Sequence, residues 1–294
     1  MENFSEKFNQ EGLLEFFDPI LGKDTRSFID PYLIYKQNDD MSTRCSNTIV
    51  NYFQKLLEAA STNDSKTGLA LVKNLHEIRE LHLGYAEDSN KGLGVGKNKG
   101  MELFKIISNS EAVKTGLVKD IFDTSIMLDK VADDKVSDLT ANIILKELIE
   151  FTQSICRKRN ISMQEVNFNK YIWDSSKNEW VYVKKIVLPY YEEDNTKIGI
   201  ILIPKEYVRS SLAYSLRRFY NEVMMPFYEK QAINNPSYGL VKILSRGEIK
   251  PSRTKIRSMY PCTKININNF IKNNPASYFE YKEKILKYAE LNNI

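Results

Sequence analysis

One polar segment of the chain carries residue types that could hold a divalent cation or orient a water. It reads Asp133-Asp134-Lys-Val-Ser-Asp138-Leu-Thr-Ala-Asn142, and on a helix Asp138 and Asn142 share a face because residues four apart are neighbours. Carboxylate oxygen is the hard ligand that Mg²⁺ prefers. We therefore predict that Asp138 and Asn142 are catalytic and that Asp134 and Asp138 bind Mg²⁺. The alternative is structural, with Asp138 capping a helix and Asn142 bonding the backbone of a neighbouring loop.

A glycine-rich stretch, from Gly92 to Gly100, stands ahead of an expected helix and could hold a phosphate. Glycine lets a backbone approach a ligand closely, and a helix N-terminus attracts anions. The residues predicted to contact nucleic acid here are Lys91, Gly94, Gly96, Lys97 and Lys99. Because the stretch matches neither a P-loop nor a dinucleotide-binding fingerprint, a surface loop with solvated lysines is the alternative.

The segment from Lys242 to Lys264 concentrates positive charge, with seven basic residues against the single acid Glu248. Basic side chains among small polar residues suit a phosphate backbone, and the nearby Tyr238 and Tyr260 suit stacking on bases. The residues predicted to bind nucleic acid are Arg246, Lys250, Arg253, Lys255 and Arg257. A solvated charged surface is the alternative.

The elements that must position these residues are mainly helices. Helical spacing of apolar residues predicts helices over residues 42–60, 67–80, 101–107, 139–158, 206–230 and 277–291, with a bend at Pro226. Strand patterns cover residues 28–35, 170–173, 179–188 and 198–203, the last apolar throughout as in a strand buried on both faces. The expected fold class is α+β, predominantly helical, with a small, mostly antiparallel three- or four-stranded sheet.

The same elements divide the chain into three regions, which could also form one compact domain. They are a helical region with the glycine-rich stretch (1–130), a helix-strand-strand-strand-helix core (131–230) and a basic region (231–294). The order of elements in the core resembles that of PD-(D/E)xK nucleases, in which acidic residues on two strands hold Mg²⁺ and a lysine positions the attacking water. Tyr190 and Ile203 stand where the two acids are expected, which departs from the pattern. The resemblance implies that Lys205 is the lysine, neutralising charge at the scissile phosphate, and that Asp138 supplies a migrated acid.

Four other stretches are Phe28-Ile-Asp-Pro-Tyr-Leu, Leu83-Gly-Tyr, Val136-Ser-Asp-Leu-Thr-Ala-Asn-Ile-Ile and Ile201-Leu-Ile-Pro-Lys. Together they resemble an uncharacterised bacterial family associated with restriction and anti-phage defence loci, over about residues 15–205. The resemblance implies a cytoplasmic bacterial protein that acts on or senses foreign nucleic acid, beside partner protein subunits.

Composition argues against several other classes. Cys45, Cys156 and Cys262 are far apart and form no CxxC pair, which indicates a reduced, cytoplasmic protein. His76 and His82 lie six residues apart, a spacing that shares no helix face, and we expect them to be ordinary packing or surface residues. No apolar run reaches the length of a membrane span, and the first residues lack the pattern of a secretory signal.

These observations lead to one principal expectation and two alternatives. We expect a nucleic-acid-processing protein of bacterial defence, with a metal-dependent nuclease as its enzymatic form. The first alternative is a non-catalytic sensor or adaptor subunit that binds nucleic acid or a partner protein. The second is a nucleotide or small-molecule binder that uses the glycine-rich stretch.

Overall fold

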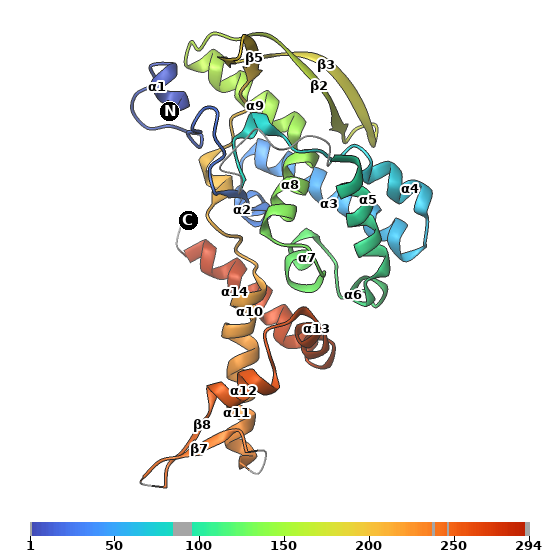
Figure 1. Ribbon diagram of the computed structural model, residues 1–294, viewed down its shortest axis with the longest axis vertical. Helices are drawn as coiled ribbons and strands as arrows, with labels where there is room; N and C mark the ends of the chain where they lie inside the picture. Colours follow the sequence, from blue (N-terminus) through green and yellow to red (C-terminus); the bar gives the residue numbers. More distant parts are fainter. Residues whose placement is uncertain (1, 85–95, 237–238, 246, 292–294) are drawn as a thin grey trace. The chain divides into compact units, whose positions relative to one another are not determined.

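The computed structural model describes residues 2–84, 96–236, 239–245 and 247–291. The α+β class is confirmed, because 53% of the chain is helical and 17% forms strands. The chain divides into two compact units (Figure 1). The first unit combines Met1–Phe122 with Lys130–Leu212, and the second combines Asp123–Asp129 with Ala213–Ile294. Within the described ranges, no helix is both long enough and apolar enough to cross a membrane.

The first unit is built mainly from helices. They are α1 (Phe4–Lys7), α2 (Pro31–Lys36), α3 (Asp40–Ser61), α4 (Ser65–Val72), η1 (Arg79–Leu81), α5 (Gly96–Asn109), α6 (Glu111–Lys114), α8 (Asp133–Ile143), α9 (Leu145–Lys158) and η3 (Lys205–Tyr207). Helix α7 (Ile121–Met127) continues into the second unit.

Helix α3 forms where the apolar spacing predicts it. Asp39 caps its start by accepting a hydrogen bond from the backbone N–H of Ser42 at 3.0 Å. Ile49, Phe53 and Leu56 recur at the three- and four-residue spacing of one helix face, and all three are buried. The prediction of a helix over residues 42–60 is confirmed.

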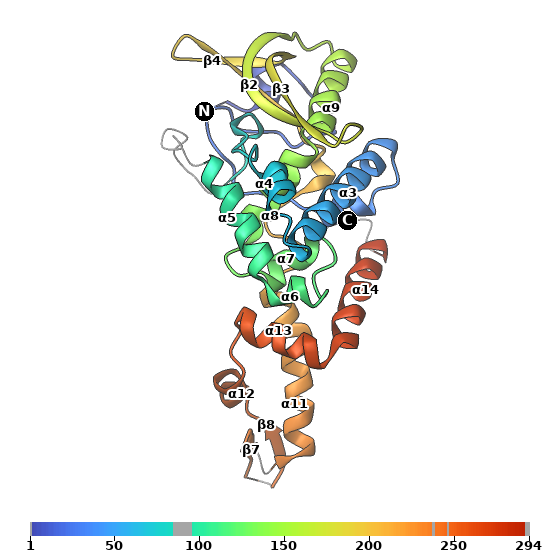
Figure 2. The ribbon, with the colours of Figure 1, turned by 90° about the vertical axis from the view of Figure 1, so that its right-hand side faces the viewer.

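The strands pair two by two in the described part of the chain, always antiparallel. The pairs are β1 (Phe28–Ile29) with β6 (Val208–Arg209), β2 (Gln164–Asp174) with β3 (Glu179–Leu188), β4 (Tyr190–Glu193) with β5 (Thr196–Gly199), and β7 (Val241–Ile243) with β8 (Ile249–Pro251). The β2–β3 hairpin is the longest pair, and it packs against α9 (Figure 2). Asp194 and Asn195 turn the β4–β5 hairpin with positive φ angles of 46° and 60°, as a tight hairpin turn requires.

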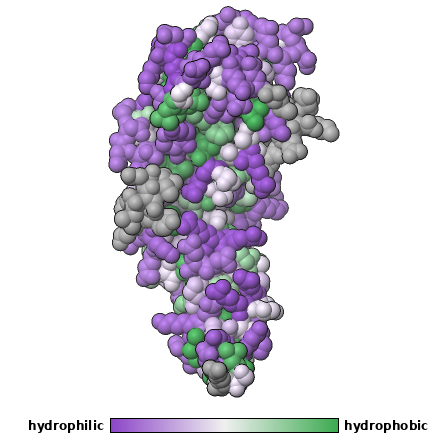
Figure 3. Space-filling view, turned by 90° about the vertical axis from the view of Figure 1, so that its left-hand side faces the viewer, coloured by the Kyte–Doolittle hydropathy of each residue, from purple (hydrophilic) through white to green (hydrophobic). Residues whose placement is uncertain are grey.

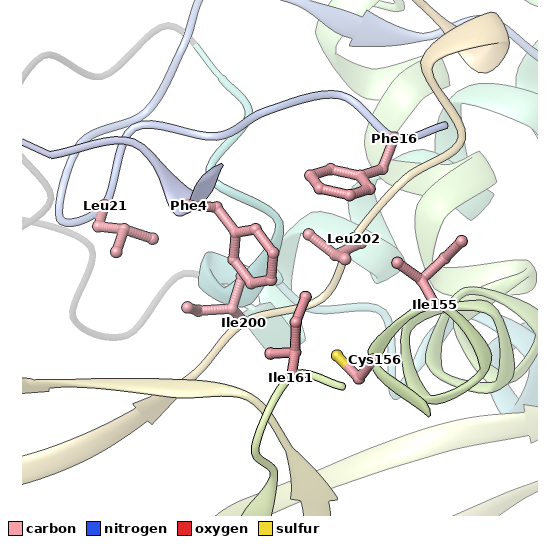
Figure 4. Packing of buried hydrophobic residues seen from close by; sticks show 8 residues of the cluster. All are labelled: Phe4, Phe16, Leu21, Ile155, Cys156, Ile161, Ile200 and Leu202. Atoms are coloured by element: carbon pink, nitrogen blue, oxygen red, sulfur yellow. The ribbon is translucent and has the colours of Figure 1, made fainter. Parts of the chain in front are cut away.

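Residues 200–203 are buried as predicted, but they do not form a strand. Their backbone N–H groups are used elsewhere: Ile200 donates to Pro189 O, Ile201 donates to Glu80 O, and Leu202 donates to Thr152 Oγ1. Ile200 and Leu202 instead enter an apolar cluster with Phe4, Phe16 and residues of α9 (Figure 4). The predicted strand over residues 198–203 is therefore wrong beyond Gly199, because burial rather than pairing explains its apolar run.

The three-stranded core that the nuclease resemblance requires is not formed by these residues. β2 pairs with β3, whereas β5 pairs with β4. Lys205, expected at the end of the third strand, lies instead in the short 3₁₀ helix η3 after Pro204. After α9 the chain forms β2, β3, β4 and β5 rather than three strands, so both the number of strands and their pairing differ from the resemblance.

Other boundaries also differ from expectation. Asp30 accepts a hydrogen bond from Tyr32 N, and Pro31 takes the first helical position, so residues 31–35 are helix rather than strand. The helix predicted over 139–158 is two helices that meet at Ile144, and Asp138 lies inside the first of them rather than capping it. The helix predicted over 67–80 ends at Val72.

The second unit is a helical assembly with one hairpin. Its helices are α10 (Leu216–Phe219), the π-helical turn η4 (Tyr220–Met224), α11 (Met225–Asn234), α12 (Arg253–Met259), α13 (Lys264–Asn273) and α14 (Pro275–Leu291). The helix predicted over 206–230 thus begins only at Leu216. The π turn lies just before Pro226, which has no N–H to donate to the preceding turn. Phe219 sits at the centre, with edge-on ring contacts to Phe270, Tyr278 and Tyr281.

Candidate functional site

A small cavity of about 60 Å³ in the first unit brings together part of the predicted catalytic set. Asp138 and Asn142 of α8 line it, together with His76, Glu77 and Lys135. Asp138 is exposed, whereas Asn142 is almost completely buried. Helix α8 therefore presents a carboxylate to solvent and an amide to the interior, on neighbouring turns.

The amide of Asn142 holds the chain that follows α4. Its Nδ2 donates to the carbonyl oxygens of His76 and Asp138, each at 2.8 Å, and its Oδ1 accepts from the backbone N–H of His76 at 3.1 Å. These bonds use both donors and one acceptor position of the amide. Asn142 thus has the structural role that was its alternative reading, because it bonds the backbone of a neighbouring loop.

His76 is a member of this site that the sequence analysis set aside. It is 66 positions from Asn142, so no local spacing relates the two residues. Its Nδ1 lies 2.8 Å from Asn74 O, while its Nε2 is buried with no hydrogen-bond partner within the described ranges. Burial is the main cause that lowers the pKa of His76, which favours the neutral ring.

The residues predicted to hold Mg²⁺ are not gathered into a ligand set. Asp134 is half-buried in the first turn of α8 and does not line the cavity, and Lys205 is exposed in η3 and does not line it either. Across the described ranges, no group of three or more His, Cys, Asp or Glu side chains could hold a metal ion. Asp134 and Asp138 are therefore not part of a larger donor set in those ranges, and the cation that lines the cavity is Lys135 rather than the predicted Lys205.

The glycine-rich stretch is partly outside the described residues, including Lys91 and Gly94. Helix α5 begins at Gly96, so the backbones of Lys97 and Lys99 belong to its first turn. Gly100 serves helix packing: a Cβ at this position would lie 2.0 Å from Val72 O of α4. The last glycine of the stretch is therefore explained by the close approach of α4 and α5.

The basic segment forms the β7–β8 hairpin and α12 of the second unit, with Arg246 outside the described residues. Two of its predicted nucleic-acid ligands have partners within the unit. Arg253 forms an ion pair with Glu229 of α11, and Lys255 Nζ donates to Gly239 O at 2.9 Å. Lys250 and Arg257 are exposed, and Lys250 forms an ion pair with the exposed Glu248 at 3.4 Å.

Of the two tyrosines expected to stack on bases, Tyr260 already has a ring partner. Tyr260 already stacks on Tyr228, with ring centroids 3.7 Å apart and ring planes 5° from parallel. Tyr238 lies outside the described residues. The Tyr228 ring covers one face of Tyr260, so a base could stack only on the other face of this ring.

The β7–β8 hairpin has one basic face and one apolar face. Lys242 stands opposite Lys250 in the register, and Ile243 stands opposite Ile249. All four side chains are exposed, and the two isoleucines expose 74% and 42% of their surface. Apolar atoms gather on the surface at this end of the second unit, at the bottom of Figure 3. Apart from the exposed Lys250–Glu248 ion pair, the hairpin leaves its two lysines and its two isoleucines open to solvent.

Residues 7–215 match the family model described as a domain of unknown function, DUF8370. The chain therefore belongs to the DUF8370 family. No curated protein and no solved structure matches the chain. The match includes the Asp138–Asn142 cavity and ends at the beginning of the second unit's main segment, so the β7–β8 hairpin lies outside the matched residues.

Proposed function

We propose that this protein binds nucleic acid through the β7–β8 hairpin, as a sensor or adaptor subunit that does not itself require a metal centre. The observation that carries the proposal is the pair Lys242 and Lys250, directly opposite each other on one face of an exposed hairpin. Like charges at directly opposed positions of a hairpin destabilise it. A phosphate between them would turn this repulsion into attraction.

The opposite face of the hairpin supports the same ligand. Ile243 and Ile249 are exposed apolar side chains on a ribbon that is two strands wide. Proteins that bind the minor groove insert apolar side chains such as isoleucine between base steps. The β7–β8 hairpin thus carries both lysines that could contact the phosphate backbone and isoleucines that could contact the bases.

Salt dependence of binding provides the test. Fluorescence anisotropy with labelled single- and double-stranded DNA and RNA, from low to physiological salt, should show binding that weakens steeply as salt increases. In the variant Lys242→Ala/Lys250→Ala, the slope of log K against log salt should fall by about 2, because two phosphate contacts are lost. The variant Lys230→Ala/Lys272→Ala removes two exposed lysines of the same unit and should leave the slope unchanged. Equal slopes in both variants, or no binding to any of the four ligands, would reject the proposal.

A nuclease is the second candidate, favoured by one observation. Asp138, Glu77, His76 and Lys135 line the same cavity, which places acidic, basic and neutral titratable groups together. A cleavage assay on the same oligonucleotides, with Mg²⁺, Mn²⁺ or EDTA, would compare the parent with Asp138→Ala. Cleavage that is lost in the variant would establish an enzyme, and binding without cleavage would leave the sensor or adaptor role.

The remaining proposals concern where the protein acts. The three free cysteines, two of them buried, support a reducing compartment, which we propose to be the cytoplasm. A role in bacterial defence beside partner subunits rests on the sequence resemblance. A plaque assay in cells with and without the gene would test that role directly.

A further inference from the structure

The first unit holds a second and much larger pocket, which none of the predicted site residues lines. Its volume is about 760 Å³, within the range of small-molecule sites. One wall is α4 with the turn that follows it, and the other is the closed end of the β2–β3 hairpin, which reaches toward α4 in Figure 1. The whole pocket belongs to the first unit.

The aromatic wall of the pocket is held in place before any ligand arrives. Trp180 Nε1 donates to the carbonyl oxygen of Leu71 at 2.7 Å, and the Tyr52 hydroxyl donates to the same oxygen at 2.8 Å. Trp173 packs edge-on against Tyr52, with ring centroids 5.0 Å apart and ring planes at 90°. Because these bonds tie the hairpin end to the end of α4, a ligand that binds there pays little for ordering the rings.

Beyond this anchored pair, the wall offers open aromatic surface. Tyr171 lines the pocket and exposes 39% of its surface. It stands opposite Tyr182, which is also exposed, with ring centroids 5.3 Å apart. Exposed aromatic faces of this kind stack on planar rings, which in nucleic-acid ligands are the bases.

The facing wall supplies positive charge. Lys66 and Lys73 line the pocket, and both are exposed. Asn74 and Asn178 add amide groups that donate and accept hydrogen bonds. Glu179 is the acid of the lining, so the two lysines leave the pocket positive on balance.

We propose that this pocket binds a nucleotide, with its base stacked on Tyr171 and Trp180 and its phosphate held by Lys66 and Lys73. A neutral sugar would use the rings without the lysines, and an acidic peptide would use the lysines without the rings. The nucleotide is the ligand that uses both walls. It can be a free nucleotide or one nucleotide of a single strand, which share this chemistry. The inference rests on the first unit alone and goes beyond the contact proposed for the β7–β8 hairpin.

The chain provides its own probe of the pocket. Its two tryptophans, Trp173 and Trp180, both line the pocket, so tryptophan fluorescence of the full-length protein reports on this site. We would titrate the protein with AMP, GMP, CMP and UMP, with single-stranded hexanucleotides, and with adenosine, ribose 5-phosphate and glucose. Calorimetry would repeat every titration, so that binding without a fluorescence change is also detected.

Variants then separate the two walls. Lys66→Ala/Lys73→Ala and Tyr171→Ala should each weaken nucleotide binding about tenfold or more, through loss of phosphate contact and of stacking respectively. Tyr171→Phe keeps the ring and should restore parent affinity. Lys105→Ala/Lys184→Ala removes exposed lysines of the same unit that do not line the pocket, and should change nothing.

The outcomes assign the ligand or overturn the proposal. Saturation by mononucleotides identifies a free nucleotide, and saturation by hexanucleotides alone identifies a nucleotide of a strand. Either no response to any phosphate-bearing base, or adenosine and glucose binding as tightly as AMP, overturns the proposal. With mononucleotides, the tryptophan fluorescence of the Lys242→Ala/Lys250→Ala variant should titrate as that of the parent does, so that failure of the hairpin proposal and failure of this one are seen separately.

Discussion

Asn142 and Asp138 lie on neighbouring turns of α8 but differ in what they contact. The Asn142 amide makes three hydrogen bonds to backbone groups and exposes 1% of its surface. Asp138 is exposed beside the small cavity. Two polar residues that look equivalent in the sequence therefore separate into a structural residue and a solvent-facing carboxylate.

This difference predicts that substitutions at the two positions change stability by unequal amounts. Asn142→Ala should lower the free energy of unfolding by about 2–4 kcal/mol, because it leaves the N–H and carbonyl of His76 without partners. Asp138→Ala should change it by less than about 1 kcal/mol, since it removes an exposed side chain. Urea denaturation of both variants measures the two values. An Asn142→Ala protein as stable as the parent would show that the amide does not hold this loop.

Acid stability should depend on His82. Its ring exposes 4% of its surface, its Nε2 has no partner in the described part of the chain, and burial lowers its pKa from 6.5 to about 4. Above pH 6.5 the ring is neutral in both states, so the native protein keeps its full stability. Between pH 6.5 and 4 the unfolded chain takes up the proton first, so stability falls, by on the order of 3 kcal/mol at most.

The His82 effect must be separated from that of Asp24, which has the opposite sign. Burial raises the pKa of Asp24 from 3.8 to about 6, so its carboxyl favours the folded state below that range and disfavours it as pH rises through it. The measurement is therefore a difference, the free energy of unfolding of the parent and of His82→Asn between pH 7.5 and 4. Asparagine tolerates the positive φ of 53° at this position. The variant should lose less stability on acidification, and parallel curves would contradict the assignment.

Helices α4 and α5 pack closely against each other at two glycines, Gly68 and Gly100. A Cβ on Gly100 would lie 2.0 Å from the carbonyl oxygen of Val72, and a Cβ on Gly68 would lie 2.0 Å from the Phe104 ring. The first neighbour is backbone, whereas the second is a buried side chain, which can change rotamer without moving its helix. The two positions should therefore respond differently to the same substitution.

We expect Gly100→Ala to destabilise the protein by about 1–3 kcal/mol, although alanine is the better helix former, because the helices must move apart. Gly68→Ala should cost less if the Phe104 ring turns away. Lys105→Ala, at an exposed position of α5, is the control and should be near neutral. Thermal unfolding ranks the three variants by stability. A Gly100→Ala protein more stable than the parent would refute the close approach of α4 and α5 at this glycine.

The second unit is built from two separate segments of the chain. Residues 123–129 belong to the second unit, although they lie within the first half of the chain and within the family match. Asp123 is fully buried there and binds Tyr278 and Lys282, the latter at 2.8 Å. Asn268 Nδ2 donates to Met127 O at 3.0 Å. A segment from the first half of the chain is thus part of the second unit's interior.

This arrangement predicts that two fragments, residues 1–212 and 213–294, bind each other when they are produced together. Segment 123–129 carries the attachment, because its buried Asp123 needs the hydroxyl of Tyr278 and the ammonium of Lys282. Co-purification through a tag on one fragment measures the association. Tyr278→Phe/Lys282→Ala in the second fragment should reduce the recovered partner several-fold, and unchanged recovery would place the attachment elsewhere.

The sequence by itself determined the α+β class, the long helices such as α3 and α14, and the strand β3. These features are local, because apolar spacing, caps and turn residues act within a few positions of each other. The Asp30–Pro31 start of α2 was equally local, and the cap signal could have been found there.

Only the tertiary structure decided the rest. It placed residues 200–203 in a core instead of a sheet, put His76 beside Asp138, and tied Arg253 and Tyr260 to neighbours. It also placed Lys66 and Tyr171 in the lining of one pocket, which their spacing in the sequence does not predict. The physical reason is common to all of them. Burial and proximity depend on which distant residues meet, and a side chain's chemistry is set by those neighbours as much as by its type.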